Sequence, residues 1–155
     1  MPQVKFYPFN YTEVRVPADP AFPDGRTLYR PALKARISSP SGAGSELCIV
    51  GLDSGACYCT FPESLASRIG IDLSRAPTLP GTMSTRDVVN QWAEVSIEIQ
   101  LDEKTPAISF SALACFSKGM DKVNAAVLGG QGFFDTFRVL FDYRARYFYI
   151  EAPER

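Results

Sequence analysis

Apolar and polar residues alternate along several short stretches of the chain, and alternation with a period of two predicts a half-buried β-strand. Residues 33–37 show the pattern, residues 95–101 repeat it, and residues 108–114 continue it. The unbroken apolar run over residues 47–52 instead predicts a strand buried on both faces. These stretches are too short and too regularly spaced for a helical protein.

Turn-forming residues separate the strands and leave room only for short helices. Pro62 suits the first turn of a helix and Gly70 its end, so we expect a helix over residues 62–69. A second short helix is expected over residues 131–136, whereas residues 76–87 have the composition of a loop. Further strands are predicted near both ends, at residues 4–7, 12–16, 137–141 and 147–151, with a loop at 17–25 and a turn at 142–145.

Many short strands with one or two short helices predict a mainly β fold, either a closed barrel or a sandwich. The length of 155 residues suits one domain, and 46% hydrophobic residues are enough for a packed core. Prolines and glycines in the first segment lead us to divide the chain into an N-terminal extension, residues 1–26, and a domain, residues 27–155.

The charge balance excludes several function classes. Sixteen basic residues face seventeen acidic ones, so there is no basic footprint for nucleic acid. No apolar run approaches the ~20 residues that span a bilayer, and no signal peptide is evident. We therefore expect a cytoplasmic protein, without a membrane span, in which the four cysteines are reduced.

The sequence contains no histidine, which narrows the chemistry further. Serine and cysteine nucleophile systems that use an imidazole base are excluded, and so are most zinc hydrolase sites. If the chain is a hydrolase, carboxylates or lysines must carry the proton transfers.

Asp53 is the candidate for that role, because it directly follows the apolar run and precedes the small residues Ser54, Gly55 and Ala56. One interpretation is an ordinary turn, since Asp, Ser and Gly are turn formers. The other is a catalytic carboxylate at the end of a strand, in a poorly solvated position. Two such carboxylates held together share one proton, so that one acts as base toward water and the other as acid toward a carbonyl.

Leu52-Asp53-Ser54-Gly55-Ala56 resembles the active-site motif of the retropepsin-like aspartic peptidases. About seventy residues later, Val127-Leu128-Gly129 resembles the hydrophobic-hydrophobic-Gly motif of that family. The expected helix at residues 131–136 and the closing hairpin follow in the family's order, and residues 60–71 resemble segments of its bacterial members. The resemblance covers residues 28–151.

The resemblance implies a single-lobe acid protease fold, a closed β-barrel, over residues 27–155. Asp53 would be the catalytic residue, Ser54 would bridge two subunits through its hydroxyl, and Gly55 would offer backbone contacts to a peptide, with Ala56 completing the loop. Beneath this loop would pack Val127, Leu128 and Gly129. The flap over the cleft would lie near residues 81–87, with Gly81, Thr82, Met83 and Ser84 as candidates.

The chain carries one Asp-[Ser/Thr]-Gly motif, so the resemblance implies a homodimer in which each subunit supplies one carboxylate to a polypeptide substrate. No cofactor and no metal are implied. Asp135 and Asp142 are rival partners within one chain, although Asp142 suits the start of the hairpin turn. The alternative function is a non-catalytic peptide-binding or protein-binding module on the same fold.

The cysteines support a third interpretation. Cys57 and Cys59 stand two residues apart, which on a strand places them on one face, where Cys48 or Cys115 could complete a metal or redox site. The simpler interpretation is that they are small buried hydrophobic residues. Cys57 and Gly130 are also departures from the family pattern, because an aspartate and a bulkier residue are usual at these places.

Overall fold

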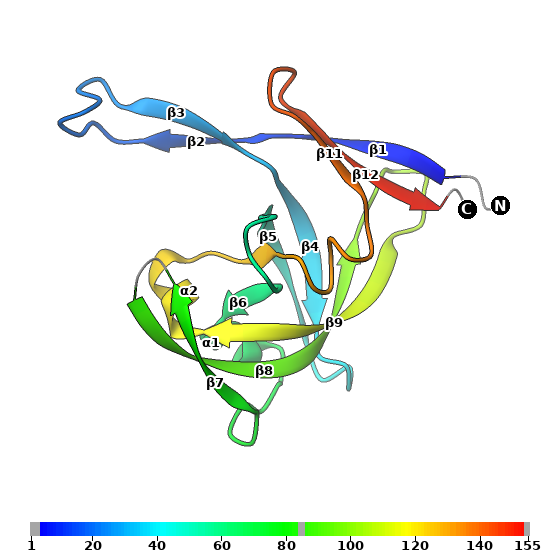
Figure 1. Ribbon diagram of the computed structural model, residues 1–155. Helices are drawn as coiled ribbons and strands as arrows, with labels where there is room; N and C mark the ends of the chain where they lie inside the picture. The colour runs from blue at the N-terminus through cyan, green and yellow to red at the C-terminus, as the bar shows by residue number, and fades with distance from the viewer. Residues whose placement is uncertain (1–3, 84–85, 154–155) are drawn as a thin grey trace.

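Six strands of the protein close into a barrel. The computed structural model describes residues 4–83 and 86–153, and Figure 1 shows the barrel in its lower half. Neighbouring strands are hydrogen-bonded in the order β4-β5-β10-β6-β9-β8, and β8 pairs with β4 to complete the ring. The bounds are β4 (Ala32–Ser38), β5 (Ser45–Leu52), β6 (Thr60–Pro62), β8 (Arg86–Ile99), β9 (Ile108–Ser117) and β10 (Val127–Leu128).

The alternation of apolar and polar residues determines which face of each strand points into the barrel. The inward residues of β4, β8 and β9 are almost completely buried, and they include Ala35, Ile37, Val95, Ile97, Ala112 and Ala114. The prediction that the whole run 47–52 is buried was wrong. Val50 and Leu52 are buried, but Leu47 and Ile49 are 55% and 65% exposed, because β5 is a wall of the barrel and only its inner face is covered.

A second sheet joins the two ends of the chain. β1 (Val4–Asn10) pairs antiparallel with β12 (Tyr147–Pro153), which pairs with β11 (Val139–Asp142). The rings of Phe9 and Phe148 stack across this sheet at 5.2 Å. The turn between β11 and β12 begins at Asp142, whose carboxylate accepts a hydrogen bond from the main-chain N–H of Ala145 at 2.9 Å, as predicted for that residue.

A two-stranded arm extends away from the barrel (Figure 1). It consists of β2 (Thr12–Val16) and β3 (Arg26–Arg30) and the predicted loop between them. Asp19 orders this loop, because its carboxylate accepts hydrogen bonds from the N–H of Phe22 and from Arg26. The bond from Arg26 lowers the pKa of Asp19 from its usual value. Residues 1–26 thus contribute to both the terminal sheet and the arm.

The helices differ in part from the prediction. α1 (Glu63–Arg68) lies within the predicted range. Residues 131–136 form a series of turns instead of a helix, and α2 (Lys118–Val123), which was not predicted, follows β9 directly. Residues 76–87 were predicted as loop but contain β7 (Thr78–Met83), because β7 pairs with β8 along its whole length. No helix in the described ranges is long and apolar enough to cross a membrane.

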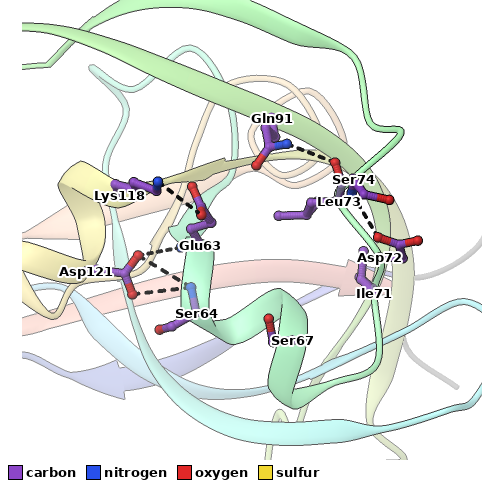
Figure 2. Close-up of a pocket in the computed structure, with 10 residues that line it drawn as sticks. All are labelled: Glu63, Ser64, Ser67, Ile71, Asp72, Leu73, Ser74, Gln91, Lys118 and Asp121. Atoms are coloured by element: carbon purple, nitrogen blue, oxygen red, sulfur yellow. Dashed lines mark hydrogen bonds and ion pairs between the residues drawn. The ribbon is translucent and has the colours of Figure 1, made fainter.

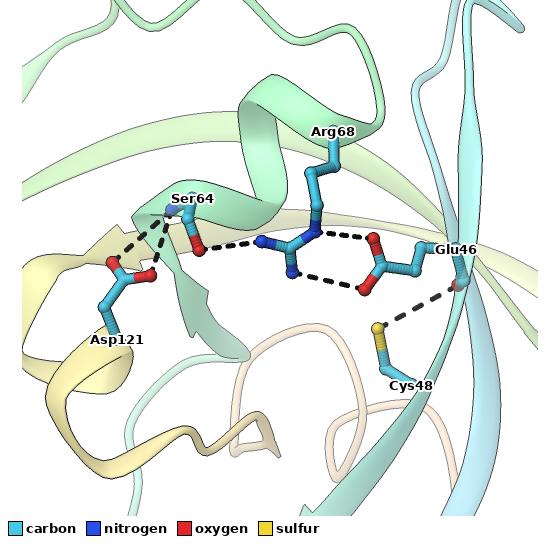
Figure 3. A network of polar contacts seen from close by, with 5 residues as sticks. All are labelled: Glu46, Cys48, Ser64, Arg68 and Asp121. Atoms are coloured by element: carbon cyan, nitrogen blue, oxygen red, sulfur yellow. Dashed lines mark hydrogen bonds and ion pairs between the residues drawn. The ribbon is translucent and has the colours of Figure 1, made fainter.

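Asp121 of α2 fixes the start of α1. Its carboxylate accepts hydrogen bonds from the main-chain N–H groups of Glu63 and Ser64, at 2.9 Å and 3.3 Å, and Figure 3 shows the contact with Ser64. At the other end of α1, Arg68 binds Glu46 of β5 through two nitrogens, at 2.7 Å and 3.2 Å. Because α1 has no capping side chain of its own, Asp121 supplies the acceptor that an N-cap residue usually provides.

Replacement of Asp121 by alanine should therefore destabilise the protein by about 1 kcal/mol, the usual effect of removing a helix cap. Asp121→Asn retains one acceptor oxygen and should recover part of the loss. Urea unfolding measures both changes, with Lys122→Ala, an exposed neighbour, as the control. Equal unfolding midpoints for Asp121→Ala and Lys122→Ala would contradict the assignment.

Candidate functional site

Asp53 lies at the end of β5, and β10 determines its position. β10 runs parallel to β5 and antiparallel to β6, so it lies between the strand that enters the Asp53 loop and the strand that leaves it. The N–H of Asp53 donates to the carbonyl of Leu128 at 3.1 Å, and Val127 and Leu128 pair with Gly51 and Leu52. The two predicted motifs are therefore adjacent in the structure, although more than seventy residues separate them.

Gly129 allows the two segments to approach closely. A Cβ atom on Gly129 would lie 2.3 Å from the carbonyl oxygen of Tyr58 and 2.8 Å from that of Ala56, distances that no side chain tolerates. The next two residues close the contact, since Gly130 N–H donates to Ala56 and Gln131 N–H to Cys57, both at 2.8 Å. The Asp53 loop is thus held by main-chain hydrogen bonds along both of its sides.

Within this loop Asp53 is exposed, as are Ser54 and Gly55. One carboxylate oxygen accepts a hydrogen bond from the N–H of Gly55 at 2.9 Å, and the main-chain oxygen of Asp53 accepts from Ala56. The expectation of a poorly solvated carboxylate was wrong for a single chain. Leu52, the residue before Asp53, is buried, whereas the three residues from Asp53 to Gly55 are exposed in the described part of the chain.

The rival carboxylates have structural roles instead. Asp135 accepts a hydrogen bond from Gly132 N–H at 3.0 Å in the turns after β10, and Asp142 starts the hairpin turn. Neither is bonded to the Asp53 loop in the described part of the chain. The second group for acid–base chemistry must come from elsewhere if Asp53 is catalytic.

The candidate flap coincides with the hairpin of β7 and β8. Gly81, Thr82 and Met83 belong to β7 and pair with Val88, Asp87 and Arg86. Ser84 lies outside the described residues. β7 is the last strand of its sheet, so this hairpin has a neighbour on only one side.

Two aromatic residues join that hairpin to the Asp53 loop. Trp92, on the part of β8 that leads back from the hairpin, packs edge-to-face on Tyr58, with ring centroids 4.5 Å apart. The carbonyl oxygen of Tyr58 is the atom that a Cβ atom on Gly129 would approach most closely. Sequence reasoning selected neither residue for the site. The signal for Tyr58 was an aromatic residue five positions after Asp53.

The cysteines do not form the predicted pair. Cys57 is exposed and Cys59 is buried, so the prediction that they share one face was wrong. The segment between Asp53 and β6 bends and is not a regular strand, which removes the alternation on which the prediction depended. Among the residues that the structure describes, no three His, Cys, Asp or Glu side chains gather in a way that could hold a metal ion.

One hollow of the surface lies beside α1, and Asp53 is not among the residues that line it. Its volume is about 490 Å³, and its lining comes from α1, the segment after it, β8 and α2 (Figure 2). Gln91 of β8 donates to the carbonyl of Leu73 at 2.8 Å at its edge, and Lys118 and Glu63 form an ion pair at 3.9 Å. Its lining includes none of the candidate site residues within the described ranges. The volume of a hollow does not show that catalysis takes place there, so Asp53 remains the candidate catalytic residue.

Comparison with known proteins identifies the fold. No protein-family model matches the chain, and no curated protein sequence matches it. Among solved structures, the chain is similar to a retropepsin-like aspartic protease from Rickettsia conorii, with a TM-score of 0.53 and 13% sequence identity over 100% of both chains. The mainly β barrel with two short helices therefore has a retropepsin-like fold, as predicted.

Because a Cβ atom at residue 129 would overlap main-chain atoms, Gly129→Ala should destabilise the protein by about 3 kcal/mol, at the upper end of overpacking effects. Gly51→Ala is the matched control. Its Cβ would meet nothing closer than 3.8 Å, so its effect should stay within about 0.5 kcal/mol. Chemical unfolding of the two variants gives the comparison, and similar losses in both would contradict the close approach.

The four thiols should react at very different rates. Burial raises the pKa of Cys115 to about 11 and also raises that of Cys59, whereas Cys57 is exposed. Because the thiolate is the reactive form, Cys57 should be alkylated about 100-fold faster than Cys115 at pH 8. The Cys115 rate should rise with pH up to about 11.

Iodoacetamide labelling followed by mass analysis of the peptides measures these rates, and labelling in denaturant, where the rates should become similar, is the control. Labelling of Cys115 in the folded protein as fast as Cys57 would contradict the burial.

Proposed function

We propose that this chain is an aspartic endopeptidase that works as a homodimer, with one Asp53 from each subunit. The observation that supports this most directly is the geometry of Asp53. It is an exposed carboxylate at the end of a strand, in a loop held on both sides by main-chain bonds over Gly129, on a retropepsin-like fold. An ordinary turn needs none of this support from a distant strand.

The chemistry requires two carboxylates, and symmetry supplies the second. In a two-fold dimer the same surface meets itself, so an exposed loop can bring its aspartate beside the identical one. Two carboxylates at short distance cannot both ionise easily, so the pair holds one proton and the pKa of one member rises. The exposure of Asp53 in one chain suits this arrangement, because a buried aspartate could not reach its partner.

The reaction then follows general acid–base catalysis. The ionised Asp53 takes a proton from a water molecule as that water attacks the peptide carbonyl, and the protonated Asp53 of the other subunit donates to the carbonyl oxygen. As the tetrahedral intermediate collapses, the C–N bond breaks and the amine takes a proton from one aspartate. A hydroxyl of the intermediate gives its proton to the other aspartate, so the pair again holds one proton. No covalent intermediate with the enzyme forms, and no cofactor or metal takes part.

The substrate is proposed to be an extended polypeptide lying between the Asp53 loops and the β7–β8 hairpins. An extended peptide can pair with strand-like main chain at such a site, while pockets select its side chains. In this arrangement Ser54 joins the two loops through its hydroxyl, and Gly55 offers main-chain contacts. Gly81–Met83 form part of the cover.

Asp53→Asn should abolish cleavage of a peptide library, by at least about 1000-fold across a pH series, because an amide can neither take nor share the proton. Asp24→Asn removes the same charge at an exposed position of the arm that has no ion pair among the described residues, so it should leave cleavage unchanged. Native mass spectrometry of all three proteins should show dimers.

Each result separates the proposal from its alternative. Cleavage that persists in Asp53→Asn would reject Asp53 as the catalytic residue. A folded dimer that binds peptides but cleaves none would instead support the non-catalytic binding module. A protein that stays monomeric at every concentration would reject the shared site.

A further inference from the structure

Two buried polar atoms on β8 have no hydrogen-bond partner within the described ranges of the chain. They are Oδ1 of Asn90 and Nε1 of Trp92, an acceptor and a donor. Buried polar groups in folded proteins are almost always paired, so two unpaired atoms on one strand call for a partner that the described residues do not supply. The rest of each side chain is only half-buried, so the position is near the surface.

The two atoms lie on one face of the strand, because residues two apart in a strand point the same way. Their cross-strand neighbours on β9 are Ser117 and Cys115, both buried. The Ser117 hydroxyl accepts a hydrogen bond from Gly119 N–H, and neither it nor the Cys115 thiol is bonded to Asn90 Oδ1 or Trp92 Nε1. These two strand neighbours therefore do not supply the missing bonds.

The position connects this pair to the proposed active site. Trp92 packs edge-to-face on Tyr58, and the Tyr58 carbonyl lies against the Gly129 position that supports the Asp53 loop. Toward its other end, β8 continues into the hairpin with β7. The Trp92 face of β8 therefore lies beside the Asp53 loop, on the strand that continues into the hairpin.

We propose that Trp92 and Asn90 form a subsite that selects a carboxamide side chain, asparagine or glutamine, of the polypeptide substrate. This rests on the proposed endopeptidase function. The Trp92 N–H donates to the carboxamide oxygen, and the carboxamide NH2 donates to the Asn90 oxygen. A ligand of this subsite must offer an acceptor and a donor together.

The chemistry of the two atoms suits a carboxamide, because one planar carboxamide group carries both an acceptor oxygen and a donor NH2. A carboxylate would place an oxygen against the Asn90 oxygen, and an aliphatic side chain would leave both atoms unpaired, so both should be rejected.

Trp92 is the only tryptophan of the chain, so its fluorescence reports directly on this subsite. The ligands are alanine-based octapeptides in which a single glutamine occupies each position in turn, with glutamate and methionine peptides as matched pairs. They are titrated into the Asp53→Asn variant, which cannot consume them. At one position the glutamine peptide should shift the Trp92 emission and bind at least about tenfold more tightly than its glutamate and methionine counterparts.

Variants of the same strand supply the controls. Asn90→Ala, in the Asp53→Asn background, should lower the affinity for the glutamine peptide to that for methionine. Glu94→Gln, an exposed change on the same face of β8, should leave it unchanged. With Asp53 intact, Trp92→Phe keeps an aromatic ring against Tyr58 but removes the N–H, so the preference in kcat/KM for glutamine over methionine should fall about tenfold. Near-ultraviolet circular dichroism verifies that each variant is folded.

The outcomes distinguish the subsite from the enzyme. Cleavage without a carboxamide preference, or an unchanged preference in Trp92→Phe, would overturn the subsite and leave the endopeptidase intact. Carboxamide-selective binding without cleavage by the intact protein would support the subsite and reject the endopeptidase. Equal binding of all three peptides, or no binding of any, would overturn the subsite and leave a structural water as the partner of both atoms.

Discussion

The structure depends on the close approach of β10 to the Asp53 loop at Gly129. At this point two segments from distant parts of the chain come closer than any side chain would allow. Main-chain hydrogen bonds on both sides then hold the loop. On one side the N–H of Asp53 donates to the Leu128 carbonyl, and on the other the N–H of Gly130 donates to the Ala56 carbonyl. Because main-chain atoms carry the contact, the loop is fixed without relying on the particular residues that it displays. An exposed carboxylate can therefore sit on a rigid support, which acid–base chemistry needs.

In the proposed dimer each chain presents half of such a site. Burial and a like charge both raise the pKa of a carboxyl group. In the proposed dimer both influences come from the second subunit, so the site becomes catalytically competent only when the two subunits assemble.

The terminal sheet, in which β1 and β12 pair, brings the first and last parts of the chain together above the barrel (Figure 1).

The hairpin and the Asp53 loop are linked through aromatic packing. Trp92 on β8 contacts Tyr58, and the Tyr58 carbonyl lies against the Gly129 position, so one chain of packed contacts runs from the hairpin base to the loop. On the opposite face of β8, Gln91 lies at the edge of the hollow beside α1. The two faces of β8 therefore contact different parts of the molecule. Among the residues that the structure describes, only the Trp92 face of β8 carries buried side-chain polar atoms without a hydrogen-bond partner.

The sequence by itself determined the elements whose cause is local. The alternation of apolar and polar residues predicted β4, β8 and β9. Pro62 and Gly70 indicated the two ends of α1, and Asp142 indicated the turn between β11 and β12. It also brought Asp53 and Gly129 forward as parts of one site, through a resemblance. Only the tertiary structure decided which side of the apolar run 47–52 is covered, that residues 76–83 include a strand, and that Cys57 and Cys59 diverge. It alone placed Tyr58 against Trp92. Each of these depends on a partner far away in the chain, and local patterns carry no information about partners that only folding brings together.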